Sequence, residues 1–174
     1  MLRKFLLTVF SLTATACTTT DKQPPLQKVA AVDLNRFMGD WYVLASIPTF
    51  VEKGAHNALE NYKLLPDGTI AITFTFRKDA FDGELKTLTM KGTVVEGTGG
   101  AEWKVSPFWP LKLPYYTIEL DPEYRWVVVA TPNRGYLWIM ARQRALPDGT
   151  LEAIINRMVA LGFPRDEIKL VPQQ

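Results

Sequence analysis

Residues 36–50 read RFMGDWYVLASIPTF, and this stretch decides the fold. Gly39 stands two residues before Trp41, and an apolar run typical of a β-strand follows until Pro48 ends it. The smallest and the largest residue types therefore stand together at the start of the first predicted strand. Both residues need a structural reason.

Further strand-forming runs follow along the chain. They are rich in β-branched and aromatic residues, and turn residues separate them at short intervals. With the first run, they predict eight strands, at 41–47, 57–65, 69–77, 84–95, 101–107, 115–121, 124–132 and 135–143. Because 47% of the residues are hydrophobic and 11% aromatic, one compact domain is expected.

The segments between these runs have two lengths, which alternate. Tight turns are predicted at 66–68, 97–100 and 121–123, and longer loops at 48–56, 78–83 and 106–114. In an up-and-down antiparallel sheet, successive connections fall at opposite ends, so one end is expected to be closed and the other open. Eight strands are about the number at which a closed barrel holds one small ligand. The predicted fold is an all-β, eight-stranded antiparallel up-and-down barrel.

One amphipathic helix is predicted after the strands and is expected to pack on the barrel wall. Its apolar positions follow the helical period, at Leu151, Ile154, Ile155 and Met158. Thr150 is the expected N-cap, and Gly162 with Pro164 ends the helix. The alternating run 168–171 predicts a short edge strand.

The N-terminus predicts export. Residues 1–16 combine a positive start with an apolar run of about a dozen residues, shorter than the roughly 20 that a membrane-spanning helix needs. They are therefore predicted to be a cleaved signal peptide. Residues 17–32, rich in Thr and Pro, predict a flexible tether that leads to a folded domain at 33–174.

Charge and residue counts exclude several classes of function. Removing residues 1–16 leaves 18 basic and 18 acidic residues without a basic block, so no nucleic-acid partner is expected. His56 is the only histidine and Cys17 the only cysteine, which argues against a multi-histidine metal site and an internal disulfide. No catalytic residues, metal or cofactor are predicted.

With Gly39-Asp40-Trp41 opening the first strand and TPNRGYLWIMAR at 131–142 ending in Arg142, the chain resembles the lipocalins over residues 34–172. More narrowly, it is similar to the bacterial outer-membrane lipocalins. The resemblance implies that Trp41 plugs the closed end of the barrel and that Arg142 lies across its ring and donates to backbone carbonyls. It also implies that Gly39 lets the segment entering the first strand pass close to this plug. Asp121 remains from the family's second motif.

The resemblance extends to the predicted cleavage site. Cys17 is similar to the lipidated cysteine of bacterial lipoproteins, although Ala14 stands where the family favours Leu. The resemblance implies a lipid anchor in the outer membrane, facing the periplasm, with Thr18 favouring this membrane over the inner one. Ordinary cleavage nearby, with a free thiol, is the alternative. A homodimer is a further expectation by analogy.

Strand alternation, with Trp41 and Arg142 pointing inward, predicts the interior of the barrel. The inward residues include Val43 and Ala45 on the first strand and Ile118 and Leu120 on the sixth. The predicted ligand-binding residues are Asn61, Phe74, Phe76, Met90, Tyr116, Tyr136, Trp138 and Met140. This interior is almost wholly apolar, and it either holds a guest or is filled by its own side chains.

A fatty acid or lysophospholipid is the expected guest, stored or transported at the membrane with its headgroup near cationic rim residues such as Lys53 and Lys112. A lipid-modifying enzyme and a structural envelope lipoprotein are the alternatives. The enzyme is disfavoured because no acid/base pair is predicted on an inward face. The loop at 106–114 is either a lid, a membrane-touching tip or a self-association patch, or it is packed locally.

Overall fold

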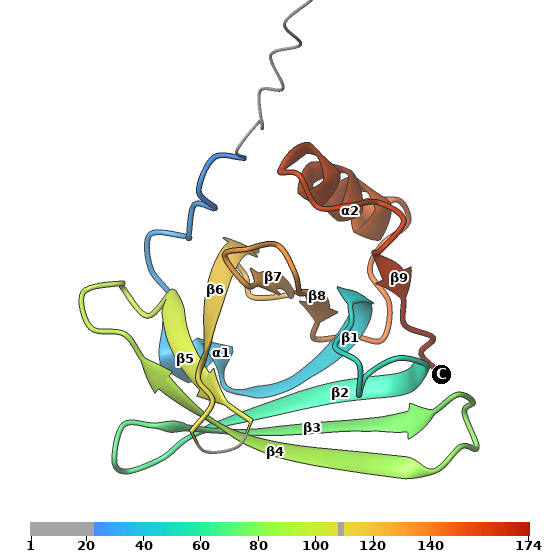
Figure 1. The fold of residues 1–174 in the computed structure, drawn as a ribbon, viewed down its shortest axis with the longest axis horizontal. Coiled ribbons are helices and arrows are strands. Elements are labelled where there is room, and N and C mark those ends of the chain that lie inside the picture. The colour runs from blue at the N-terminus through green and yellow to red at the C-terminus, as the bar shows by residue number, and fades with distance from the viewer. Residues whose placement is uncertain (1–22, 108–109) are drawn as a thin grey trace, which may run out of the picture.

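The protein is a closed antiparallel β-barrel with one long helix outside it (Figure 1). The computed structural model describes residues 23–107 and 110–174. The barrel strands are β1 (Gly39–Ile47), β2 (Ala55–Leu64), β3 (Ile70–Lys78), β4 (Leu85–Val94), β5 (Glu102–Ser106), β6 (Leu113–Leu120), β7 (Trp126–Ala130) and β8 (Leu137–Ala141). Each pairs with the next, and β1 pairs with both β8 and β2, so all eight predicted strands are confirmed.

The connections alternate between the two ends of the barrel, as predicted for an up-and-down sheet. Those after β2, β4 and β6 lie at one end, beside the short helix α1 (Leu34–Phe37), which Asp33 caps through its carboxylate. Those after β1, β3, β5 and β7 lie at the other end. We call these the closed and the open end. The predicted difference in length fails after β4, where the connection 95–101 is as long as the loop 48–54 after β1. No helix in the described part of the chain is long and apolar enough to cross a membrane.

The C-terminal segment completes the wall where β1 and β2 separate. Only the first part of β1, Gly39 to Tyr42, pairs with β2, and β9 (Lys169–Leu170) pairs with Ala45 and Ser46. Beyond β9, the side-chain amide of Gln173 donates to the carbonyls of Val43 and Ala58, at 2.8 and 3.0 Å. The predicted edge strand is confirmed, and it continues into a bridge between β1 and β2.

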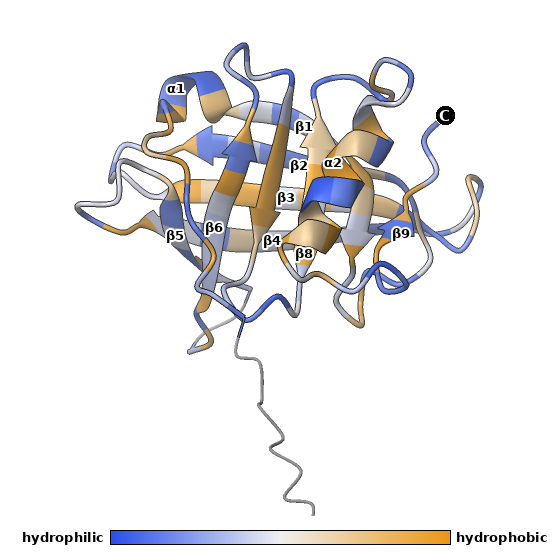
Figure 2. Cartoon of the chain, turned by 90° about the horizontal axis from the view of Figure 1, so that it is seen from above, coloured by the Kyte–Doolittle hydropathy of each residue, from blue (hydrophilic) through white to orange (hydrophobic). Residues whose placement is uncertain are grey.

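Helix α2 (Thr150–Ala160) packs on the outside of the barrel (Figure 2). Its buried residues Ile154, Ile155 and Met158 belong to the same apolar cluster as Val128 and Ile139 of β7 and β8. Thr150 is not the N-cap. The cap is Gly149, in the left-handed conformation and without a side-chain hydrogen bond, because the turn preceding the helix places Thr150 already inside its first turn.

Residues 23–32 are packed on the barrel, although they were predicted to belong to a flexible tether. Leu26 is buried in the cluster beneath α2, and the backbone N–H of Val29 donates to the carbonyl of Thr117 at 3.0 Å. The N–H of Val32 donates to the carbonyl of Gly99 at 2.8 Å. The apolar side chains of Leu26, Val29 and Val32, spaced three residues apart, hold this segment to the barrel wall. The predicted signal peptide and Cys17 lie outside the described residues.

The barrel contains register shifts in β1, β2 and β6, and those in β1 and β6 change which of the predicted residues face the interior. In β1 the register shifts between Val43 and Ala45, so Val43 faces inward and Ala45 outward, beneath α2. In β6 the register shifts between Thr117 and Glu119. A one-residue shift turns every following side chain to the other face. Strict alternation across these strands was therefore wrong.

Candidate ligand-binding site

The closed end is built around Trp41 and Arg142. The indole of Trp41 is fully buried, and the guanidinium carbon of Arg142 lies 3.7 Å from its ring centroid, a cation–π contact. The guanidinium also donates to four carbonyls of the segment that enters β1, at 2.7 to 3.1 Å: those of Arg36, Phe37, Met38 and Asp40. Arg142 therefore ties the end of β8 to the start of β1, as predicted.

Gly39 is explained by its backbone conformation. Its φ is +93°, which residues with a side chain rarely adopt. An added Cβ would lie 3.6 Å from Nη1 of Arg142, which is an ordinary contact. The positive φ, more than a lack of space, thus requires glycine between α1 and the tryptophan plug.

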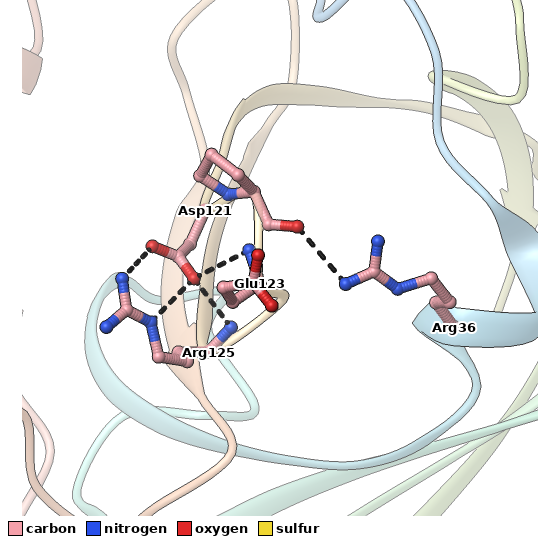
Figure 3. Close-up of polar contacts among 5 residues, drawn as sticks. Arg36, Asp121, Glu123 and Arg125 are labelled. Carbon is pink, nitrogen blue, oxygen red and sulfur yellow. Dashed lines mark hydrogen bonds and ion pairs between the residues drawn. The ribbon is translucent and has the colours of Figure 1, made fainter.

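Asp121 organises the turn between β6 and β7 at the same end (Figure 3). Its buried carboxylate accepts two bonds from the guanidinium of Arg125, at 2.7 and 2.8 Å, and one each from the backbone N–H groups of Glu123 and Arg125. The hydrogen bonds from Arg125 lower the pKa of Asp121. The guanidinium of Arg36 donates to the carbonyl of Pro122, which connects the turn to α1.

Replacing Asp121 with alanine is expected to lower the free energy of unfolding by about 2 kcal/mol, because two backbone N–H groups lose their acceptor and Arg125 its partner. Urea unfolding at neutral pH measures the loss. The exposed neighbour is the control: Glu123→Ala is expected to change stability by less than about 0.5 kcal/mol. Equal effects of the two substitutions would contradict a special role for Asp121.

The inner wall of the barrel, which encloses the lumen, carries most of the predicted ligand-binding residues. Phe74 and Phe76 on β3 and Trp138 and Met140 on β8 are buried in the luminal cluster, while Met90 and Tyr136 are partly buried against it. Two predictions were wrong. Tyr116 faces outward beneath the Lys28 ammonium, and Tyr115 takes the luminal place. Asn61 also faces outward, where its amide donates to Asp40 at 2.6 Å.

The lumen contains a polar cluster that the sequence analysis missed. The cluster consists of Glu52, Glu60, Tyr62, Tyr115 and Trp138, all of them buried. The hydroxyl of Tyr62 donates to Glu60 and accepts from Tyr115, since a phenol has only one proton to give. The indole N–H of Trp138 donates to the carboxylate of Glu52 at 3.3 Å. The predicted, almost wholly apolar interior is therefore corrected.

Burial controls the protonation of these carboxyls. Loss of hydration, reinforced by the negative charge of Glu52, raises the pKa of Glu60 to about 8. Burial also raises the pKa of Glu52, against hydrogen bonds from Thr49 and Trp138. No Lys or Arg is among the buried side chains of the described residues. Glu60 is thus protonated at neutral pH, and no buried cation accompanies the two carboxyls.

A pocket of about 710 Å³ lies at the open end. It is bounded by the end of β1 with the following loop, by Gly135, and by the segment around β9. Its lining includes six ionisable side chains: Glu52, Lys53, His56, Asp166, Glu167 and Lys169. Since Glu52 also contacts Trp138, this pocket adjoins the luminal cluster.

Residues 32–173 match the model of the lipocalin-like domain. The chain belongs to the lipocalin family. The outer membrane lipoprotein Blc of Vibrio cholerae is 30% identical over 150 residues, 86% of this chain and 87% of the relative. Temperature-induced lipocalin-1 of Arabidopsis thaliana is 29% identical over 157 residues, 85% of this chain and 83% of the relative.

Solved lipocalin structures agree with the barrel. Insecticyanin from Manduca sexta superposes with a TM-score of 0.65 over 86% of this chain and 85% of its own, at 14% identity. At this identity the likeness shows the fold alone.

The sequence did not reveal the luminal Glu60 because β2 carries polar residues on both of its faces. The available signal was that Glu60 lies on the same face of β2 as Ala58 and Tyr62.

Proposed function

We propose that this lipocalin binds a single-chain lipid, a fatty acid or lysophospholipid, and stores or transports it at the bacterial outer membrane. The observation that supports this function best is the apolar luminal wall of the barrel, sealed at one end by Trp41 and adjoining a pocket at the other. The names of several relatives, outer membrane lipoproteins, support the location. An anchor on Cys17 is part of the proposal.

The driving force would come from the acyl chain. Each buried methylene contributes about 0.8 kcal/mol, so about 14 of them offer on the order of 11 kcal/mol before the costs of ordering the complex. Luminal side chains such as Phe74 and Met90 supply the apolar contacts. Binding of this kind selects for the length of the chain.

The headgroup would stay at the open end. Glu52 and Glu60 are buried among the luminal side chains, and no Lys or Arg of the described residues is buried with them. The pocket at the open end is lined by Lys53 and Lys169 together with the carboxylates of Glu52, Asp166 and Glu167. An acyl chain pointing inward, with its anionic head beside these two lysines, is the arrangement proposed.

Native mass spectrometry tests the proposal directly. A form that begins after Cys17, purified from bacteria without detergent, is expected to carry about one fatty acid or lysophospholipid per chain, or one per dimer. Denaturing extraction would identify the lipid. A bare protein that stays bare after incubation with both lipid classes would contradict the proposal and favour a purely structural barrel.

A substitution that fills the lumen tests the site. Leu88 of β4 is partly buried against the luminal cluster, and Leu88→Trp is expected to weaken lysolipid binding at least about tenfold by occupying the space of the guest. Thr89→Trp, on the same strand but on its exposed outer face, is the matched control. Titration of a fluorescent lysolipid measures both. Equal lysolipid affinities of the two variants would contradict the lumen as the binding site.

A lipid-modifying enzyme is the second candidate, and the luminal acid cluster favours it. An enzyme was disfavoured because the sequence predicted no acid/base pair on an inward face. Glu52 and Glu60 are two buried carboxyls that could form such a pair, with Glu60 protonated. Incubation with lysolipids and esters, followed by mass analysis, separates the two functions. A binding protein returns its ligand unchanged, whereas turnover that Glu60→Gln abolishes would establish an enzyme.

A further inference from the structure

Exposed apolar side chains gather at the open end of the barrel. Six of the large hydrophobic residues that are more than a third exposed come from four segments of this end, namely the loop after β1, the β3–β4 hairpin, the loop after β5, and β9: Phe50, Val51, Phe81, Leu85, Leu111 and Leu170. Phe50 is the most exposed of them, at 82%. We call these six residues the rim ring. Large apolar side chains collected at one end of a protein indicate an interaction surface.

Lysines accompany the rim ring. Lys53 follows Phe50 and Val51 in the same loop, and Lys112 follows Leu111. Within the described residues, neither ammonium group makes an ion pair or a hydrogen bond. Apolar side chains that enter a lipid layer, next to lysines that remain at its surface, form the pattern of an interfacial membrane contact.

The N-terminal segment leads to the same end. From Asp33, whose N–H donates to Tyr124 at the closed end, the chain runs back along the wall to Pro24. The carbonyl of Pro24 accepts from Arg134, in the loop after β7 at the open end, at 2.6 Å. Figure 2 shows this segment approaching the open-end loops. Because residues 23–32 are bound to the barrel, only five residues lie between Cys17 and Gln23, and a chain of this length reaches about 20 Å.

We propose that the rim ring docks on a phospholipid bilayer, so that the mouth of the barrel faces the membrane. This inference rests on the proposed function for its anchor at Cys17, which would hold the open end within about 20 Å of the lipid surface. A protein partner would be expected to meet a continuous face, whereas the rim ring is spread over several separate segments of the open end. Facing the membrane, the barrel would exchange its guest with the bilayer without exposing the acyl chain to water.

Site-specific labels test the docking. A chain that begins at Thr18 contains no cysteine, so Phe50→Cys and Leu64→Cys each provide one position for an environment-sensitive dye. Leu64 is the matched control because it is also exposed and apolar but lies at the closed end. The probe membrane is a vesicle of phosphatidylethanolamine and phosphatidylglycerol, three to one. The label at position 50 is expected to brighten and shift to the blue on vesicle addition, and the label at position 64 to stay unchanged.

Partition measurements complete the test. Phe50→Ala with Leu170→Ala is expected to lower partition onto the same vesicles by at least about tenfold, and Leu64→Ala to leave it unchanged. Absence of vesicle binding by the parent chain, an equal response of both labels, or an equal loss in both variants would overturn the docking. Titration of the parent chain with a soluble lysolipid is independent of vesicles. If the parent chain binds the lysolipid but not the vesicles, only the docking is contradicted. If it does not bind the lysolipid, the proposed function is contradicted.

Discussion

Replacing Trp41 with alanine is expected to lower the free energy of unfolding by about 4 kcal/mol, which is the range for removing a large buried aromatic side chain. The indole is fully buried, and its ring centroid lies 5.2 Å from that of Phe37. Its N–H donates to the carbonyl of Phe37 at 2.8 Å. The substitution also uncovers the Arg142 guanidinium, so packing, a hydrogen bond and a cation–π contact are lost together.

Urea unfolding at neutral pH measures this loss, and a second tryptophan supplies the control. Trp126 is partly buried on the outer wall, with the Arg157 guanidinium 5.7 Å from its ring centroid. Trp126→Ala removes the same side chain from a more exposed place and is expected to cost less than half as much. A loss of 1 kcal/mol or less at position 41 would contradict the tryptophan plug as the main support of the closed end.

The free energy of unfolding is expected to fall by about 4 kcal/mol as the pH rises from 4.5 to 8, and Glu60→Gln is expected to remove most of this fall. In the folded barrel the pKa of Glu60 is about 8, against 4.5 ordinarily. Between these values the unfolded chain has released the proton that the folded chain retains, so each pH unit costs about 1.4 kcal/mol. The contribution of Glu60 is fully present below pH 4.5 and is lost as the pH rises through 8.

Urea unfolding at pH 5, 7 and 9 measures this dependence. Glutamine keeps an acceptor for the Tyr62 hydroxyl but does not titrate, so the variant is expected to be the more stable protein at pH 9. Because burial also raises the pKa of Glu52, a smaller fall of the same sign should remain. Glu96→Gln, at an exposed position, is the control and should follow the parent chain. A parent chain whose stability does not change over this range would contradict the burial of an uncompensated carboxyl.

The fold follows from local sequence because each strand and turn carries its own signal. Turn residues such as those at 66–68 separate the strands, and in an antiparallel up-and-down sheet successive connections then fall at opposite ends. The positions of Trp41 and Arg142 on the first and eighth strands then bring them together. Helix α2 was equally predictable, because its apolar residues recur with the helical period.

The luminal site was only partly predictable. Phe74, Phe76, Trp138 and Met140 lie on strands in regular alternation, and counting by twos placed them correctly. The same counting failed at Tyr116 in the bulged β6, because a bulge adds one residue to a strand without a distinctive residue type. Asn61 was misplaced because β2 was polar on both faces, so hydrophobicity did not reveal which face was buried.

The sequence by itself determined the barrel, its closed end and the helix outside it, because periodicity and turn chemistry act between neighbouring residues. Only the tertiary structure decided the register at the bulges in β1, β2 and β6, the packing of residues 23–32 along the wall, and the bridge that Gln173 makes between β1 and β2. It also decided that Glu52 and Glu60, eight residues apart in a polar segment, share one buried site. These features depend on contacts between distant segments, whose energies exist only once the barrel has closed.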